Sequence, residues 1–168
     1  METVTCNLDH RILAWIEKVE NREIAACKEQ HLLASYIRKC FDEEEIYTDS
    51  EMLTKYLGLS KYFPYETVFE WEQFCIALHL CTFWKDDQRP RWPDLLLVIG
   101  RGAGKDGYIA LESFALASPY SGLIEYDVDI CANAEEQAMR PVNDILNVLE
   151  MPKHSAKLRK YYRWTNRS

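Results

Sequence analysis

The first sixty residues place apolar side chains at the three- and four-residue spacing of amphipathic helices. Ile12, Ile16 and Val19 fall on one face of a predicted helix, and such a face packs against a core. Asp9 precedes this run and is a residue type that caps helix N-termini. A second helix is predicted over residues 22–41, where apolar residues recur at mixed three- and four-residue spacings.

Two further helices are predicted before residue 85. Thr48-Asp49-Ser50-Glu51 offers a capping box for a short third helix, and Gly58 is suited to end it. Residues 60–64 are predicted to form a loop, and residues 65–84 an apolar, aromatic-rich helix. The charged, proline-containing stretch 85–93 is predicted to be a surface connection.

Beyond residue 93 the pattern changes from helical spacing to a short continuous apolar run. Leu95-Leu96-Leu97-Val98-Ile99 is bounded by Pro93 and Gly100, as expected of a strand buried on both faces. A glycine-rich turn over residues 100–107 follows, and residues 108–117 have the pattern of a helix. This part of the chain therefore predicts a buried strand, a tight turn and a helix.

A second strand and helix are predicted after a turn over residues 118–122. The strand lies near residues 124–132, and Asn133 can cap the next helix, with Glu136 completing the capping box. Pro141 is expected to kink or end that helix. Strand, helix, strand, helix is the order of a parallel sheet. The predicted fold class is therefore α/β, with a helical N-terminal portion followed by the first part of a parallel sheet flanked by helices.

The composition is that of an ordinary folded protein. Of the 168 residues, 48% are hydrophobic and 28% are charged, which argues against wholesale disorder. No apolar run approaches the roughly 20 residues that a membrane helix needs. Met1-Glu2-Thr3-Val4 has neither a basic leader nor a long apolar stretch. We therefore expect a cytoplasmic protein with no membrane partner.

Cysteine spacing bears on metal binding. The chain has six cysteines and no Cys-x-x-Cys pair, whereas structural zinc sites usually contain such pairs. We interpret the cysteines as reduced thiols that serve as small apolar residues.

The net charge of −7 conceals an asymmetry. Residues 151–168 carry a charge of +6 and no acid, so the first 150 residues hold the remaining −13. An acidic body with a basic tail can indicate an anionic partner at one end. A solvated terminal helix explains the same pattern, and the charges do not separate the two interpretations.

The glycine-rich turn has the sequence Gly100-Arg101-Gly102-Ala103-Gly104-Lys105-Asp106, which we call the phosphate loop. Glycines let successive backbone N–H groups turn inward around phosphate oxygens. The helix that follows directs the positive end of its dipole at the anion. Lys105 is placed to reach the β- and γ-phosphates of a nucleotide. The alternative is a glycine-rich strand-to-helix turn with a surface lysine.

The loop departs from the usual phosphate-loop pattern in two places. Ile99 precedes Gly100, which makes this a compressed version of the loop. Asp106 stands where a serine or threonine usually follows the lysine. A carboxylate can still bind Mg²⁺, directly or through water, so Asp106 is the predicted metal ligand.

Arg101 gives the loop a resemblance to one family. Terminase large subunits, the ATPases that pump DNA into the capsids of tailed phages, carry an arginine inside the phosphate loop ahead of Gly-Lys. The resemblance implies a P-loop-type sheet with ATP and Mg²⁺ as cofactors. It implies catalytic roles for Arg101, near the γ-phosphate, and for Lys105. It implies nucleotide contacts by Gly100, Gly102, Ala103, Gly104, Lys105 and Asp106. A surface arginine is the alternative.

About thirty residues upstream, the same family carries a Trp-Gln pair that contacts adenine. Glu70-Trp71-Glu72-Gln73-Phe74 resembles it, with Trp71 and Phe74 in register. Glu72 stands where glutamine is expected, and Gln73 comes one residue late. A glutamate cannot donate to the adenine edge as an amide can. The resemblance implies that Trp71 and Gln73 lie near the base, and packing in a core is the alternative.

Weaker similarity extends the resemblance over residues 24–150. It divides the chain into a helical N-terminal region, residues 1–62, and a partial P-loop ATPase domain with a basic C-terminal tail, residues 63–168. It implies dsDNA, a portal protein and a small terminase subunit as partners, inside a bacterial host cell.

Two parts of the intact family are not found in the sequence. One is an apolar strand ending in Asp-Glu, which holds Mg²⁺ and activates water, and the other is the nuclease domain. We therefore expect a front portion of such an ATPase. The alternatives are a non-catalytic nucleotide-binding or assembly module and, third, a small phosphotransferase. A partial sheet would expose apolar edges, which predicts self-association unless the N-terminal helices mask them.

Overall fold

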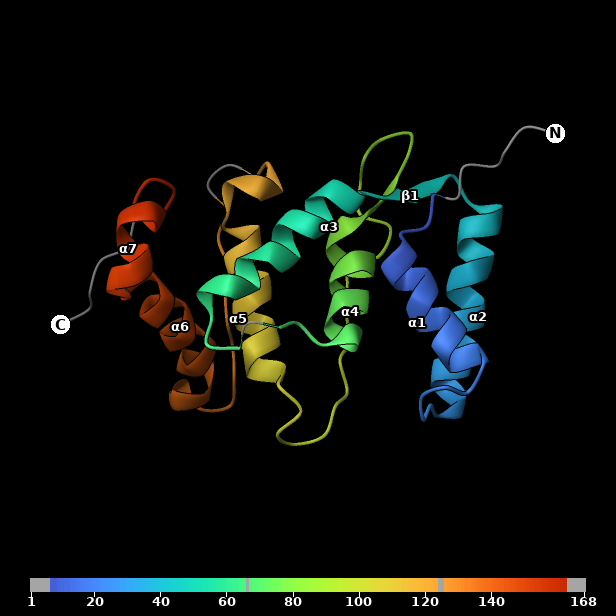
Figure 1. Cartoon of the computed structure of the whole chain (residues 1–168), viewed down its shortest axis with the longest axis horizontal. Helices are drawn as coiled ribbons and strands as arrows, with labels where there is room; N and C mark the ends of the chain where they lie inside the picture. Colours follow the sequence, from blue (N-terminus) through green and yellow to red (C-terminus); the bar gives the residue numbers. More distant parts are fainter. Residues whose placement is uncertain (1–6, 66, 124–125, 163–168) are drawn as a thin grey trace. The chain divides into compact units, whose positions relative to one another are not determined.

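The structure is a computed structural model that describes residues 7–65, 67–123 and 126–162. Within these residues the chain is mainly helical, with seven α-helices, two 3₁₀ helices (η) and two short strands (Figure 1). In chain order these are α1 (His10–Glu20), α2 (Lys28–Glu43), β1 (Ile46–Thr48), α3 (Ser50–Leu57), η1 (Gly58–Tyr62), α4 (Glu70–Cys81), β2 (Thr82–Trp84), α5 (Lys105–Leu116), η2 (Pro119–Ser121), α6 (Glu135–Glu150) and α7 (Pro152–Leu158). Helices therefore accompany a small sheet, and that sheet is antiparallel.

Contacts between residues divide the chain into two compact units. The first, Met1–Thr54 with Val68–Leu97, contains α1, α2, β1, α4 and β2. The second, Lys55–Thr67 with Val98–Ser168, contains η1, α5, η2, α6 and α7. The division falls within α3, so each unit is built from two stretches of chain, whereas the predicted regions 1–62 and 63–168 cut the chain once.

Asp9 caps α1 as predicted. Its carboxylate accepts a hydrogen bond of 2.9 Å from the backbone N–H of Arg11, which satisfies a donor that a helix start leaves open. Burial raises the pKa of Asp9, but the hydrogen bonds and the charge of Arg11 outweigh burial and hold this pKa far below its usual value. Ile12, Ile16 and Val19 are buried, so the predicted apolar face is confirmed.

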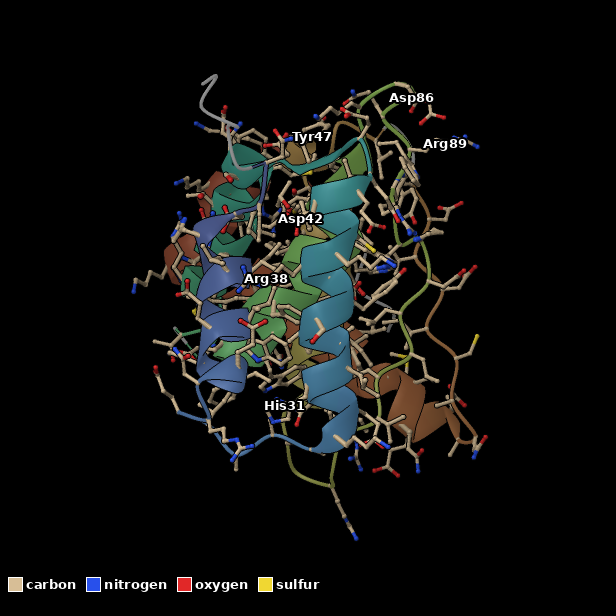
Figure 2. The ribbon with its side chains drawn as sticks, turned by 90° about the vertical axis from the view of Figure 1, so that its right-hand side faces the viewer. His31, Arg38, Asp42, Tyr47, Asp86 and Arg89 are labelled. Carbon is tan, nitrogen blue, oxygen red and sulfur yellow. The ribbon has the colours of Figure 1, made fainter. Side chains whose placement is uncertain are left out.

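The second helix begins later than predicted. Arg22 has a φ of 58°, which a right-handed helix does not accommodate, and the chain turns here before α2 starts at Lys28. The two helices then run side by side (Figure 2). Arg38 of α2 donates a hydrogen bond of 2.8 Å to Glu20 of α1.

Two strands that the sequence did not indicate pair in the first unit. β1 and β2 are antiparallel, with Ile46 opposite Trp84 and Thr48 opposite Thr82. The hydroxyl oxygens of Thr48 and Thr82 lie 3.1 Å apart, and Thr82 donates a 2.8 Å hydrogen bond to the Ala77 carbonyl. Each strand has three residues, too few for an alternating pattern to be recognised in the sequence.

The side chain of Arg91 holds the connection that follows β2 in place by contacts within the first unit. Its guanidinium lies 5.0 Å from the ring centroids of Trp84 and Trp92 and donates a 2.9 Å hydrogen bond to Glu44. Hydrogen bonding to Glu44 raises the pKa of Arg91, and hydrogen bonding to Arg91 lowers the pKa of Glu44. Residues 85–90 are exposed, so the predicted surface connection is confirmed, and Arg91 anchors its end.

The core of the second unit is built from aromatic rings around Phe114 of α5. Tyr162 stacks on Phe114, with ring centroids 4.6 Å apart and an interplanar angle of 11°. Phe63 meets the same ring edge-on at 5.5 Å. The Tyr162 hydroxyl donates a 3.2 Å hydrogen bond to the Phe114 carbonyl, and burial raises the pKa of Tyr162. Such ring pairs stabilise a core beyond the area that they bury.

The two strands predicted in the second half of the chain are not formed in the described residues. Residues 95–99 have no strand partner there, and the side chains of Leu96 and Val98 are 90% and 85% exposed. The described part of the second predicted strand, residues 126–132, is likewise unpaired; residues 124 and 125 lie outside the description. The prediction of a strand buried on both faces is therefore wrong here, because a parallel strand obtains its burial and its hydrogen bonds from neighbouring strands.

The last long helix also differs from its prediction. α6 runs without interruption from Glu135 to Glu150 through Pro141, and its N-cap is Ala134, not Asn133. Proline removes one helical N–H and crowds the preceding turn, which is why an end or a kink was expected. The Pro141 ring is buried, and α6 packs along α5 in the second unit (Figure 1). We attribute the persistence of α6 to this packing, which offsets the lost hydrogen bond.

Candidate phosphate-binding site

The phosphate loop consists of a tight turn followed by a helix start. The backbone N–H of Ala103 donates a 3.2 Å hydrogen bond to the carbonyl of Gly100. Gly102, in the third position of this turn, has a φ of 83°, a region that glycine adopts without strain. Gly104 has a φ of 89° and is the N-cap of α5, which begins at Lys105. The predicted turn and helix are therefore both present, but the helix starts at Lys105, three residues before the predicted range 108–117.

The sign of the backbone angle φ alternates along the phosphate loop. Gly102 and Gly104 have positive φ, Ala103 between them does not, and Lys105 is helical. Anion-binding nests are built from residues of opposite backbone hand in succession, which turn their N–H groups toward one side. Among the described residues, no acceptor receives a hydrogen bond from the N–H groups of residues 105–107. These donors lie at the positive end of the helix dipole, where an anion is favoured.

Three charged side chains gather at the junction of α5 and α6. Lys105 forms an ion pair with the carboxylate of Asp106, and Arg140 of α6 lies 3.9 Å from the other oxygen of that carboxylate. The side chain of Lys105 is 61% exposed and that of Asp106 33% exposed. The site thus holds two cations, both reachable from water, on either side of a half-buried anion.

Tyr65 contacts the first turn of α5 at Gly107. The hydroxyl of Tyr65 donates a 2.8 Å hydrogen bond to the Gly107 carbonyl. A Cβ atom at position 107 would lie 3.2 Å from two atoms of the Tyr65 ring. The missing side chain therefore lets Tyr65 approach and hold the helix end on which Lys105 lies.

Arg101 projects from the turn between Gly100 and Gly102. It is exposed, and within the described part of the chain it forms no hydrogen bond or salt bridge. Its charge is available to a ligand of the loop. A surface arginine would look the same, so the role implied by the family resemblance stays a prediction.

The residues expected near adenine have structural partners in the first unit. The Nε2 group of Gln73 donates a 2.9 Å hydrogen bond to the Val68 carbonyl. Glu72 is buried and accepts a 2.8 Å hydrogen bond from the backbone N–H of Phe69, the N-cap of α4. Burial raises the pKa of Glu72. Trp71 is half-buried on the same helix. Trp71 and Gln73 belong to the first unit and the phosphate loop to the second, and base contact remains a prediction.

The metal ligand predicted from the sequence is Asp106. Among the described residues, no three His, Cys, Asp or Glu side chains form a group that could hold a metal ion. Asp106 offers a carboxylate beside the loop, and Mg²⁺ bound to a nucleotide typically takes one or two protein carboxylates and completes its shell with phosphates and water. The site therefore fits Mg²⁺ that arrives with a nucleotide better than a resident metal.

Comparison with known proteins gives no relative for this chain. No family model, no curated protein and no solved structure matches it. Within the described residues, no helix is both long enough and apolar enough to cross a membrane. The functional argument therefore depends on the residues of the loop and their surroundings.

Arg140 was not among the residues singled out from the sequence. The only local signal was Glu136 four residues before it, a spacing that places both side chains on one helix face. The structure shows them 3.8 Å apart. That Arg140 also approaches Asp106 depends on the packing of α6 on α5, which the sequence did not reveal.

Proposed function

We propose that this chain is the nucleotide-binding portion of a DNA-packaging ATPase of the terminase large subunit type, and that the phosphate loop binds ATP with Mg²⁺. The observation that supports the proposal is the alternating backbone of Gly102 and Gly104 directly before Lys105 and α5. A loop of this geometry presents N–H groups, a helix dipole and an ammonium group to the same anion.

Each residue of the loop has a role in this proposal. The backbone N–H groups of residues 100–106 surround the phosphates, except that of Ala103, which is bonded to the Gly100 carbonyl. Lys105 neutralises the β- and γ-phosphate oxygens. Asp106 contributes an oxygen to the Mg²⁺ shell. Arg101 stabilises the charge that develops on the γ-phosphate. A Mg²⁺ ion held there by Asp106 would supply positive charge that offsets the charge of the phosphate oxygens.

The proposed ATPase also requires a parallel sheet. Residues 95–99 and 126–132 would become its strands on pairing with further strands, which would cover the exposed side chains of Leu96 and Val98. dsDNA, a portal protein and a small terminase subunit are the proposed partners of the assembled motor. The basic residues of α7 and of residues 159–160 are a candidate surface for DNA; Arg163 and Arg167 of the basic tail lie outside the described residues.

The first test is binding of ATP and ADP in the presence of Mg²⁺, measured by calorimetry. We expect the wild-type chain to bind, and Lys105→Ala to bind at least about tenfold more weakly, because a charge-assisted contact to phosphate is lost. Lys85→Ala is the matched control, since Lys85 is also an exposed lysine paired with a carboxylate, Glu45. Equal binding by wild type and Lys105→Ala, or none by either, would refute the proposed function.

A second candidate function is a non-catalytic assembly module. The exposed apolar side chains of Leu96 and Val98 favour it, because an exposed apolar segment outside any helix or strand is open to pairing with another chain. The two functions differ in whether ATP is hydrolysed. Phosphate release by the wild-type chain that is lost in Lys105→Ala supports the ATPase. Nucleotide binding without phosphate release supports the assembly module.

A further inference from the structure

The ion pair between Lys105 and Asp106 conflicts with the proposed role of Lys105. An ammonium group that is to contact a phosphate must leave the carboxylate that holds it. The Asp106 side chain is only 33% exposed, so a lost partner is replaced by water incompletely. Leaving a half-buried carboxylate unpaired costs free energy, and this cost would be subtracted from anion binding.

Arg140 is in place to reduce that cost. Its Nη1 atom lies 3.9 Å from Oδ2 of Asp106, whereas Lys105 contacts Oδ1. The two cations therefore approach different oxygens of one carboxylate. The other partner of Arg140 is Glu136, at 3.8 Å; the Glu136 side chain is 88% exposed, so water can solvate it when Arg140 moves.

The negative charge of Asp106 affects a second ionisable group on α6. Asp144 lies one turn beyond Arg140 on that helix, and its pKa is raised by burial and, second, by the negative charge of Asp106. The same carboxylate attracts the Arg140 guanidinium, which lies 3.9 Å from it.

We propose that Arg140 is a positioning residue for the phosphate loop: when an anion enters the loop, Lys105 passes from Asp106 to the anion and Arg140 takes over the Asp106 carboxylate. The inference rests on the proposed anion binding by the loop. The exchange needs rotation of exposed side chains only, because Arg140 already lies beside Asp106. No covalent bond forms or breaks.

The exchange is tested with pyrophosphate in the absence of Mg²⁺, so that no metal role of Asp106 contributes. Calorimetry compares wild type, Arg140→Gln, Asp106→Asn and the double variant. We expect Arg140→Gln to bind about two- to fivefold more weakly, the range of a partly exposed ion pair. Asp106→Asn should bind more tightly, because Lys105 is then released. In the Asp106→Asn background, Arg140→Gln should have no further effect.

Two controls separate this exchange from general effects. Lys153→Gln removes one exposed positive charge of the same unit and measures how far net charge alone weakens binding. Arg140→Lys keeps the charge and is expected to bind like wild type, and it provides a second variant if Arg140→Gln fails to fold. Circular dichroism and thermal unfolding report the folding of each variant.

Three results would overturn the inference. If Arg140→Gln weakens binding equally with and without Asp106, Arg140 contacts the anion itself. If Arg140→Gln behaves like Lys153→Gln while Lys105→Ala abolishes binding, the loop binds anions and Arg140 has no positioning role. If Lys105→Ala binds pyrophosphate as well as wild type does, the proposed function fails, and this inference fails with it.

Discussion

Glycine serves two different purposes at the start of α5. Gly102 and Gly104 supply positive φ angles, without which the N–H groups of the loop would not turn to one side. Gly107 supplies space, because Tyr65 lies where its Cβ would be. The sequence pattern identifies Gly102 and Gly104 as loop residues. The requirement for glycine at position 107 comes from Tyr65, more than forty positions away in the chain, and is not visible in the local sequence.

Gly107→Ala is therefore expected to destabilise the second unit. The Tyr65 ring would have to move, and its hydroxyl would lose the Gly107 carbonyl, so we expect a cost of about 1–3 kcal/mol, as for overpacking. Better helix propensity of alanine offsets less than about 1 kcal/mol of this. Thermal and urea unfolding measure the change.

Gly58→Ala is the control for this prediction, because a Cβ there meets no atom within 4 Å. We expect it to be neutral or slightly stabilising. Equal stability of Gly107→Ala and wild type would show that Tyr65 does not restrain the helix start.

Among the secondary-structure elements, those marked by local chemistry could be predicted from the sequence. Asp9 and the spacing of Ile12 and Ile16 define α1, and the glycines before Lys105 define the start of α5. The failures arise where distant contacts decide: β1 and β2 pair across more than thirty residues, and α6 passes through Pro141. The apolar run 95–99 was predicted as a buried strand, but it is not a strand in the structure and Leu96 and Val98 are exposed, because the burial of a strand depends on neighbouring strands.

Burial of Glu72 in α4 makes the stability of the fold depend on pH. Its pKa is raised by burial above the usual value of 4.5, so the folded chain holds this proton more tightly than the unfolded chain. The contribution of Glu72 to the free energy of unfolding therefore falls as pH rises from about 4.5 through the raised pKa. Glu72→Gln keeps an acceptor for the Phe69 N–H and carries no charge.

We expect Glu72→Gln to raise the midpoint of thermal unfolding at neutral pH, and the gain to disappear below about pH 4.5. Glu70→Gln, on the same helix with a side chain 61% exposed, serves as control and should show no such gain. A gain for Glu72→Gln that is independent of pH would mean that ionisation is not its cause.

For the whole molecule, the most consequential feature is the exposure of residues 95–99. Leu96 and Val98 leave apolar side chains in water on a segment outside any helix or strand, and such a segment is open to pairing with another chain. The sequence predicted apolar edges on a partial parallel sheet, whereas in the described residues the exposed apolar side chains lie outside any strand.

We expect concentration-dependent self-association of the wild-type chain, with Leu96→Lys shifted toward monomer. Light scattering after size exclusion over a range of concentrations measures both. Leu32→Lys is the control, since Leu32 is 61% exposed but lies on a helix, α2, whose backbone groups are already hydrogen-bonded. A wild-type monomer at all concentrations, or the same shift with Leu32→Lys, would contradict pairing through residues 95–99.

The stacking of Tyr162 on Phe114 sets a practical limit on shortening this protein. The ring that Tyr162 covers belongs to α5, the helix whose first residue is Lys105. A chain cut before position 162 would leave that ring open to water and remove the hydrogen bond to the Phe114 carbonyl. Any shortened chain used to test the proposed phosphate binding should therefore retain the residues through Tyr162.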